Sequence, residues 1–167
     1  MNIDDCFKEG LLKRIKPQLE TAKKEIENAK KYLDKARKNE GMGIYDIAVI
    51  AAYTSMFHAA WTILYRDGIK ERSHICIVLY FKSKYLELRE QARILDTYRR
   101  FRHTALYGIE DIIDNVEAET SIPLADEFIK IIEKKICVLM HTRIKYEAAG
   151  PHSSSASSPA GTGLVLI

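Results

Sequence analysis

The chain has few of the features by which secreted and membrane proteins are recognised. Its 167 residues include only three cysteines, Cys6, Cys76 and Cys137, which are far apart and in no paired spacing. They indicate neither a disulfide framework nor a zinc site, and a reducing cytoplasm is the expected location. Asp4 and Asp5 occupy the region where a signal peptide needs a basic flank. No run approaches the roughly 20 apolar residues that span a bilayer, so we expect no membrane partner.

The sequence also lacks the patterns of common catalytic sites. Its five histidines are never paired at a spacing that puts two of them on one helix face, as a metal site on a helix requires. No glycine-rich segment follows a strand, and no serine or cysteine lies in the context of a nucleophile elbow. The sequence therefore predicts no metal ion and no cofactor, and it gives no support to a hydrolytic triad.

Helical periodicity is what the sequence does contain. Apolar residues recur at steps of three and four over about residues 7–38, 44–66 and 86–113, and a shorter helix is expected over about 75–81. Pro17 should kink the first helix or mark the start of its main segment. The hydroxyls and proline of 120–123 predict the start of a last helix that runs to about Tyr146. Together these patterns predict an all-α, up-and-down bundle of about five helices.

The composition changes near residue 148. We assign residues 1–147 to the bundle and 148–167 to a tail, where Gly, Pro, Ser, Ala and Thr dominate and no residue is charged. Such a segment cannot bury enough apolar surface to become ordered. We expect a flexible tail, with a composition that suits an appended or read-through segment.

The second predicted helix is apolar nearly all round, which predicts the central helix of the bundle. One of its faces has only small residues, namely Ala48, Ala52, Ser55, Ala59 and Thr62, so another helix can approach it closely. His58, on the same helix, is expected to be a hydrogen-bonded core or rim residue. His74 follows Ser73, a possible helix N-cap, and is expected to be a polar residue at the edge of a loop.

The candidate functional residues lie in the segment from Arg99 to Gly108. Arg99, His103 and Tyr107 are four residues apart and lie along one side of a helix, with Arg102 beside them. Such a row offers cationic donors for phosphate and one group that titrates near neutrality. A ribonuclease site needs a base for the ribose 2′-hydroxyl and cations for the charge on phosphorus. The alternative is that the arginines pair with acids such as Asp96 and only solvate the helix.

Four segments, Ile47 to Ala60, Gly68, Ser73-His74 and Arg102 to Tyr107, follow one another in an order that resembles the HEPN superfamily. The resemblance is closer to the small stand-alone prokaryotic HEPN proteins that are often encoded beside a minimal nucleotidyltransferase. It covers roughly residues 10–146, and an Arg-x-x-Ala-x-Tyr signature matches Arg102, Ala105 and Tyr107. The resemblance implies a helical bundle that dimerises with this motif near the dimer cleft. It also implies nucleotide or RNA binding, commonly within toxin-antitoxin or defence pairs.

The nucleases of this superfamily carry Arg-x(4–6)-His, and here Tyr107 stands where the histidine would be. A tyrosine with a pKa near 10 is a poor base at pH 7. We therefore interpret the chain as a non-catalytic or weakly catalytic nucleotide- or RNA-binding module that forms a homodimer and is the partner of a nucleotidyltransferase. Its expected binding residues are Arg99, Arg102, His103 and Tyr107. One alternative is a metal-independent endoribonuclease toxin with His103 as base. The other is a non-enzymatic protein-interaction bundle that docks through the small-residue face or the basic first helix.

Overall fold

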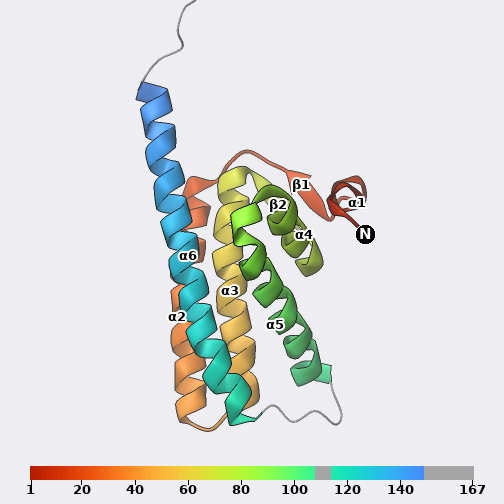
Figure 1. Cartoon of the computed structure of the whole chain (residues 1–167), viewed down its shortest axis with the longest axis vertical. Coiled ribbons are helices and arrows are strands. Elements are labelled where there is room, and N and C mark those ends of the chain that lie inside the picture. Colours follow the sequence, from red (N-terminus) through yellow and green to blue (C-terminus); the bar gives the residue numbers. More distant parts are fainter. Residues whose placement is uncertain (108–113, 149–167) are drawn as a thin grey trace, which may run out of the picture.

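The computed structural model of the chain describes residues 1–107 and 114–148, with side chains for 1–103 and 114–137. This part of the chain forms a helical bundle with a small N-terminal addition (Figure 1). The all-α class is confirmed, with six α-helices in the described residues against about five predicted. In order, the elements are α1 (Ile3–Lys8), β1 (Leu12–Arg14), α2 (Leu19–Gly41), α3 (Tyr45–Asp67), β2 (Ile69–Glu71), α4 (His74–Lys84), the 3-10 turn η1 (Leu86–Leu88), α5 (Arg89–Tyr107) and α6 (Asn115–Ala148).

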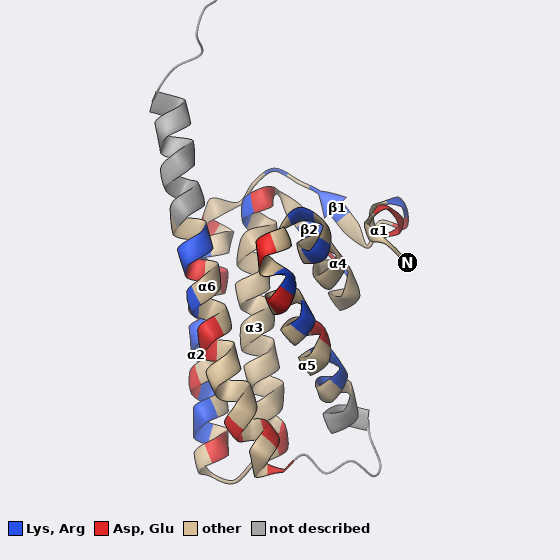
Figure 2. Ribbon diagram, viewed as in Figure 1, with Lys and Arg blue, Asp and Glu red and all other residues tan. Residues whose placement is uncertain are grey.

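Helix α3 is the centre of the bundle and packs against α2, α5 and α6. Figure 2 shows that it is almost free of charged residues, whereas α2 and α5 carry many. By length and composition α3 is apolar enough to cross a membrane, so the expectation that no stretch reaches that limit is wrong. However, 72% of its most apolar window is buried inside the bundle. A central helix needs this apolar surface because neighbouring helices cover it on several sides.

The small-residue face of α3 lies against α2, as predicted. Ala48, Ala52, Ser55 and Ala59 are fully buried. The Ser55 hydroxyl donates a hydrogen bond of 2.8 Å to the backbone carbonyl of Ala29 in α2. A side chain can reach a neighbouring helix backbone in this way only where the two helices lie very close together.

The prediction of one helix over residues 7–38 is wrong for its first part. That segment instead contains the end of α1, strand β1 and an extended link that leads into α2. β1 pairs antiparallel with β2, with Leu12 opposite Glu71 and Arg14 opposite Ile69. Gly68 turns the chain from α3 into β2 with a φ of +70°, and a Cβ there would lie 2.4 Å from the carbonyl oxygen of Ile15. The link is therefore packed directly onto the end of α3, and only glycine fits this turn.

Helix α6 begins earlier than predicted, at Asn115, and Pro123 lies inside it. Asp114 caps this start, since its Oδ1 accepts hydrogen bonds from the backbone amides of Val116 at 2.8 Å and Glu117 at 3.4 Å. The predicted helix over 86–113 is present as η1 and α5 up to Tyr107. Residues 108–113 and the predicted tail from 149 onward lie outside the described residues.

Cys6 of α1 and Cys76 of α4 form a disulfide, with their Cα atoms 5.9 Å apart. The expectation that the cysteines are unpaired is therefore wrong for these two. They are separated by 70 residues, and both are fully buried. A pair this distant in sequence is brought together only by the packing of α1 on α4.

Candidate functional site

The arginines of α5 differ in their partners. Arg99 donates two hydrogen bonds to Oδ1 of Asp96, at 3.0 and 2.9 Å. Arg100 donates one to Oδ2 of the same carboxylate at 2.7 Å. Arg102 makes no hydrogen bond or ion pair with any side chain or backbone atom in the described part of the chain. The expected alternative, pairing with acids, therefore holds for Arg99 and Arg100, whereas Arg102 has no acidic partner among the described residues.

Beside these arginines lies a hydrogen-bonded pair from two other elements. The hydroxyl of Tyr53, buried in α3, is 2.6 Å from Nδ1 of His74, the first residue of α4. The His74 ring also packs against the ring of Phe57, with 3.8 Å between the ring centres. Three elements thus meet here: the middle of α3, the start of α4 and the last described turns of α5.

Electrostatics connects this pair to the arginines. Burial, with added repulsion from the guanidinium groups of Arg102 and Arg99, lowers the pKa of His74 to about 4. The imidazole is therefore neutral at pH 7. Burial also raises the pKa of Tyr53, and the same two arginines partly oppose that shift. Both arginines lie close enough to influence His74 and Tyr53, so we treat the four side chains together and call them the Arg102 cluster.

The four predicted site residues have different outcomes. Arg99 and Arg102 come together in the Arg102 cluster. His103 is exposed on the same helix. Tyr107 is the last residue of α5, and its side chain lies outside the described residues. The roles given to these residues in binding remain predictions.

Two residues of the cluster were missed from the sequence. His74 was expected at a loop edge, but it is half-buried and bonded to Tyr53. One signal was present: a tyrosine hydroxyl inside an apolar helix needs a polar partner, and Tyr53 lies in such a helix. Which residue supplies that partner depends on how α4 packs on α3, and helical periodicity does not give that.

A row of half-buried polar and aromatic side chains continues along α3 away from the cluster. His58 bonds through Nδ1 to Oε2 of Glu25 at 2.6 Å, and its ring stacks on that of Tyr32 at 5.0 Å. This confirms the expected hydrogen-bonded rim histidine. Further along, the indole of Trp61 donates to Glu71 at 2.9 Å. Burial raises the pKa of Glu71, whose Oε2 is buried with no hydrogen-bond partner among the described residues.

Metal-binding geometry is not found in the described residues. Within 1–107 and 114–148, no group of three or more His, Cys, Asp or Glu side chains could hold an ion. The chemistry that the Arg102 cluster offers is instead that of a fixed cation next to a neutral imidazole and a phenol. These groups can donate hydrogen bonds to an anion such as phosphate.

The described residues thus form a small α-helical domain in which Arg102 lies near a half-buried histidine–tyrosine pair. The model of the HEPN domain matches residues 22–135, which is more than half of the chain. The chain therefore belongs to the HEPN domain family. No curated protein matches the sequence.

Proposed function

We propose that this HEPN domain binds the phosphate of a nucleotide or of RNA at Arg102 and Arg99 without cleaving it. We propose further that it acts as a homodimer and as the partner of a nucleotidyltransferase in a toxin-antitoxin or defence-like pair. The observation that carries the binding proposal is the unpaired guanidinium of Arg102. A cation without a counter-charge, beside a neutral imidazole, is free to form charge-assisted hydrogen bonds with a phosphate.

Exposed apolar side chains support the proposed homodimer. Where α2 turns into α3, large apolar side chains are exposed: Met42 by 65%, Ile44 by 40% and Ile47 by 43%. Several large apolar side chains exposed within one short segment are more typical of an interface than of a solvated surface. The nucleotidyltransferase partner rests on the resemblance to stand-alone HEPN proteins.

The binding proposal is tested by Arg102→Gln, with Arg93→Gln as the matched control. Arg93 lies nine residues earlier on α5, which places it on the opposite side of the helix, and it pairs with Glu90. We expect the affinity for a fluorescein-labelled single-stranded RNA, measured by anisotropy, to fall at least tenfold in Arg102→Gln. In the control it should stay within about twofold.

Circular dichroism and the thermal midpoint show whether both variants remain folded. Equal losses in the two variants would indicate attraction by overall charge alone. If the folded Arg102→Gln protein bound RNA and AMP as tightly as the wild type, Arg102 would not be part of the binding site.

A second candidate function is a metal-independent endoribonuclease, and one observation favours it. His74 is neutral at pH 7 and lies near two arginines that could hold a phosphate, although a pKa of about 4 makes it a weaker base than an ordinary histidine. His103 remains the other candidate base. Cleavage of RNA in the presence of EDTA, abolished by His74→Ala or by His103→Ala, would support this function and contradict a purely binding role. Under the leading proposal the wild-type protein leaves the RNA intact.

A further inference from the structure

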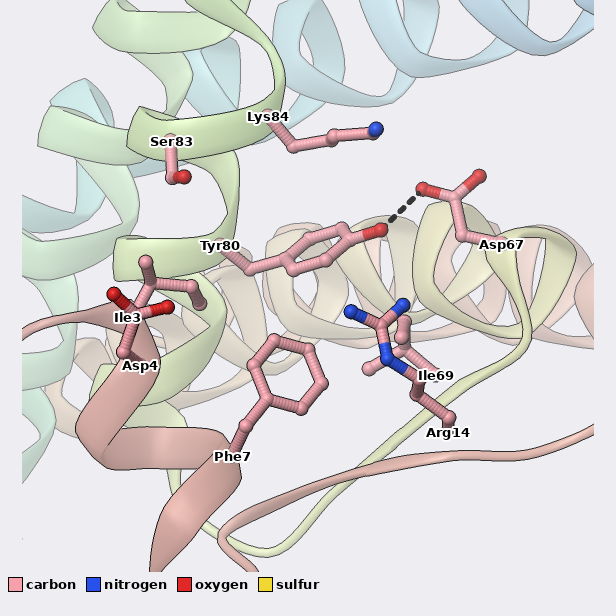
Figure 3. Close-up of a pocket in the computed structure, with 9 residues that line it drawn as sticks. All are labelled: Ile3, Asp4, Phe7, Arg14, Asp67, Ile69, Tyr80, Ser83 and Lys84. Atoms are coloured by element: carbon pink, nitrogen blue, oxygen red, sulfur yellow. Dashed lines mark hydrogen bonds between the residues drawn. The ribbon is translucent and has the colours of Figure 1, made fainter.

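A cavity of about 410 Å³ lies on another part of the molecule, between the N-terminal addition and α4 (Figure 3). None of its lining residues belongs to the Arg102 cluster. Its walls come from α1, β1, the end of α3, β2 and the second half of α4. The lining residues are Ile3, Asp4, Phe7, Arg14, Asp67, Ile69, Tyr80, Ser83 and Lys84.

Two cations, Arg14 and Lys84, line this cavity together with two acids, Asp4 and Asp67. Neither Arg14 nor Lys84 forms an ion pair or hydrogen bond with its side chain in the described residues. Asp67 does not neutralise them, because its two oxygens already accept four hydrogen bonds, two from Arg66 and one each from Tyr80 and Tyr85. Figure 3 shows the Arg14 and Lys84 side chains pointing toward the side of the cavity where the Tyr80 hydroxyl lies. An anion placed there would meet two cationic donors.

The opposite side of the cavity is formed mainly by apolar and aromatic side chains, together with the carboxylate of Asp4 beside Ile3 (Figure 3). Ile3 and Phe7 of α1 face Tyr80 of α4, and Ile69 forms part of the floor (Figure 3). The Arg14 guanidinium lies 4.9 Å from the centre of the Phe7 ring, so cationic and aromatic surfaces adjoin. A volume of a few hundred Å³, lined here by both polar and apolar side chains, is the size of a small-molecule site.

We propose that this cavity binds a small organic anion, whose phosphate or carboxylate group lies between Arg14 and Lys84 and whose apolar body lies against Phe7 and Tyr80. Phosphate monoesters and carboxylates share this chemistry. The proposal does not rest on the function proposed above, since the two sites share no residue.

The disulfide joins the two walls that hold the aromatic side chains. Cys6 precedes Phe7 in α1, and Cys76 lies one helical turn before Tyr80 in α4. α1 has only six residues, which is too short for a helix to be stable without tertiary support. Reduction should therefore loosen the α1 wall and weaken binding in this cavity.

The experiment uses titration calorimetry of the full oxidised chain with phenyl phosphate, phenylacetate and inorganic phosphate. We expect phenyl phosphate or phenylacetate to bind, and the affinity to fall at least tenfold in Arg14→Gln and in Lys84→Gln. Lys13→Gln and Lys82→Gln are the matched controls. They neighbour these positions on β1 and α4, are exposed and do not line the cavity, and they should stay within about twofold.

The remaining arms separate this site from the Arg102 cluster. A loss confined to Arg102→Gln, with Arg14→Gln and Lys84→Gln binding like the wild type, would place the ligand at α5 and overturn the proposal. Replacing both Cys6 and Cys76 by serine should weaken binding in a protein that circular dichroism shows to be folded. Absence of binding by both aromatic probes, or inorganic phosphate binding as tightly as phenyl phosphate, would also overturn it.

Discussion

Two clusters of arginine and tyrosine lie at different places in this bundle, and they reach opposite electrostatic outcomes. At the end of α3, Arg66 and Asp67 form an ion pair of 2.6 Å with side chains only 11% and 14% exposed. The hydroxyls of Tyr80 and Tyr85 donate to the same carboxylate. Of the Arg66 nitrogens, only Nη1 lacks a partner among the described residues. In the Arg102 cluster, Arg99 pairs with Asp96, whereas Arg102 has no acidic partner among the described residues. In the first cluster Asp67 balances the charge of Arg66, whereas in the second the charge of Arg102 remains available to a ligand.

The largest difference should appear when each arginine is removed. Arg66→Gln leaves the poorly exposed Asp67 carboxylate without its cation, and we expect the free energy of unfolding to fall by about 3 kcal/mol. Arg102→Gln removes no hydrogen bond or ion pair among the described residues and should change the free energy of unfolding by less than about 0.5 kcal/mol. Urea unfolding followed by the fluorescence of Trp61, the single tryptophan, measures both. Similar losses in the two variants would mean that Arg102 also has a structural partner.

Acidification should affect the Arg102 cluster through its histidine. The pKa of His74 is about 4 in the folded protein, against about 6.5 for an unperturbed histidine. Between these values the unfolded chain binds a proton that the folded chain does not, so stability falls as the pH drops from about 6.5 to about 4. We expect a loss of about 2 kcal/mol, after allowing for solvent screening of a half-buried ring.

His74→Asn provides the control for this pH dependence. Urea unfolding at a series of pH values should give a shallower slope for the variant than for the wild type, because the carboxylates that titrate in the same range are common to both. Parallel slopes would show that His74 does not carry the effect.

The smallest expected effect comes from freeing more positive charge beside Arg102. Asp96→Asn removes the carboxylate that binds Arg99 and Arg100, so both guanidinium groups become available to phosphate. We expect the RNA affinity to rise about threefold and its dependence on salt to become steeper. Glu90→Gln, which releases Arg93 on another side of α5, is the control and should change the affinity less. An equal rise in both variants would indicate an unspecific charge effect.

Periodicity predicted the main helices and their buried faces, because a helix that packs on one side shows its pattern locally. It failed over residues 7–18, where Leu12 and Ile15 continue the helical spacing although Leu12 is buried as part of a strand. It also placed the start of α6 too late, because the hydroxyls and proline of 120–123 resemble a cap while Asp114 is the residue that caps. In both places the sequence carries a pattern that is typical of a helix or of a helix start, although the structure has a strand in the first and the interior of a helix in the second.

The Arg102 cluster was predicted only in part. The spacing within α5 put Arg99 and Arg102 together, since that relation is set by a single helix. The approach of His74 and Tyr53 depends on the packing of α4 and α5 against α3. The Cys6–Cys76 bond likewise depends on contacts between segments far apart in sequence. Sequence patterns alone did not predict these contacts between elements.

The bond between Cys6 and Cys76 also makes part of the chain a covalent ring. The ring includes all of α2 and α3 and the turn at Gly41, Met42 and Gly43, which is exposed. A protease that cuts this turn would open the ring without releasing a fragment. The nicked protein should keep its full mass on a non-reducing gel and separate into two pieces only after the disulfide is reduced.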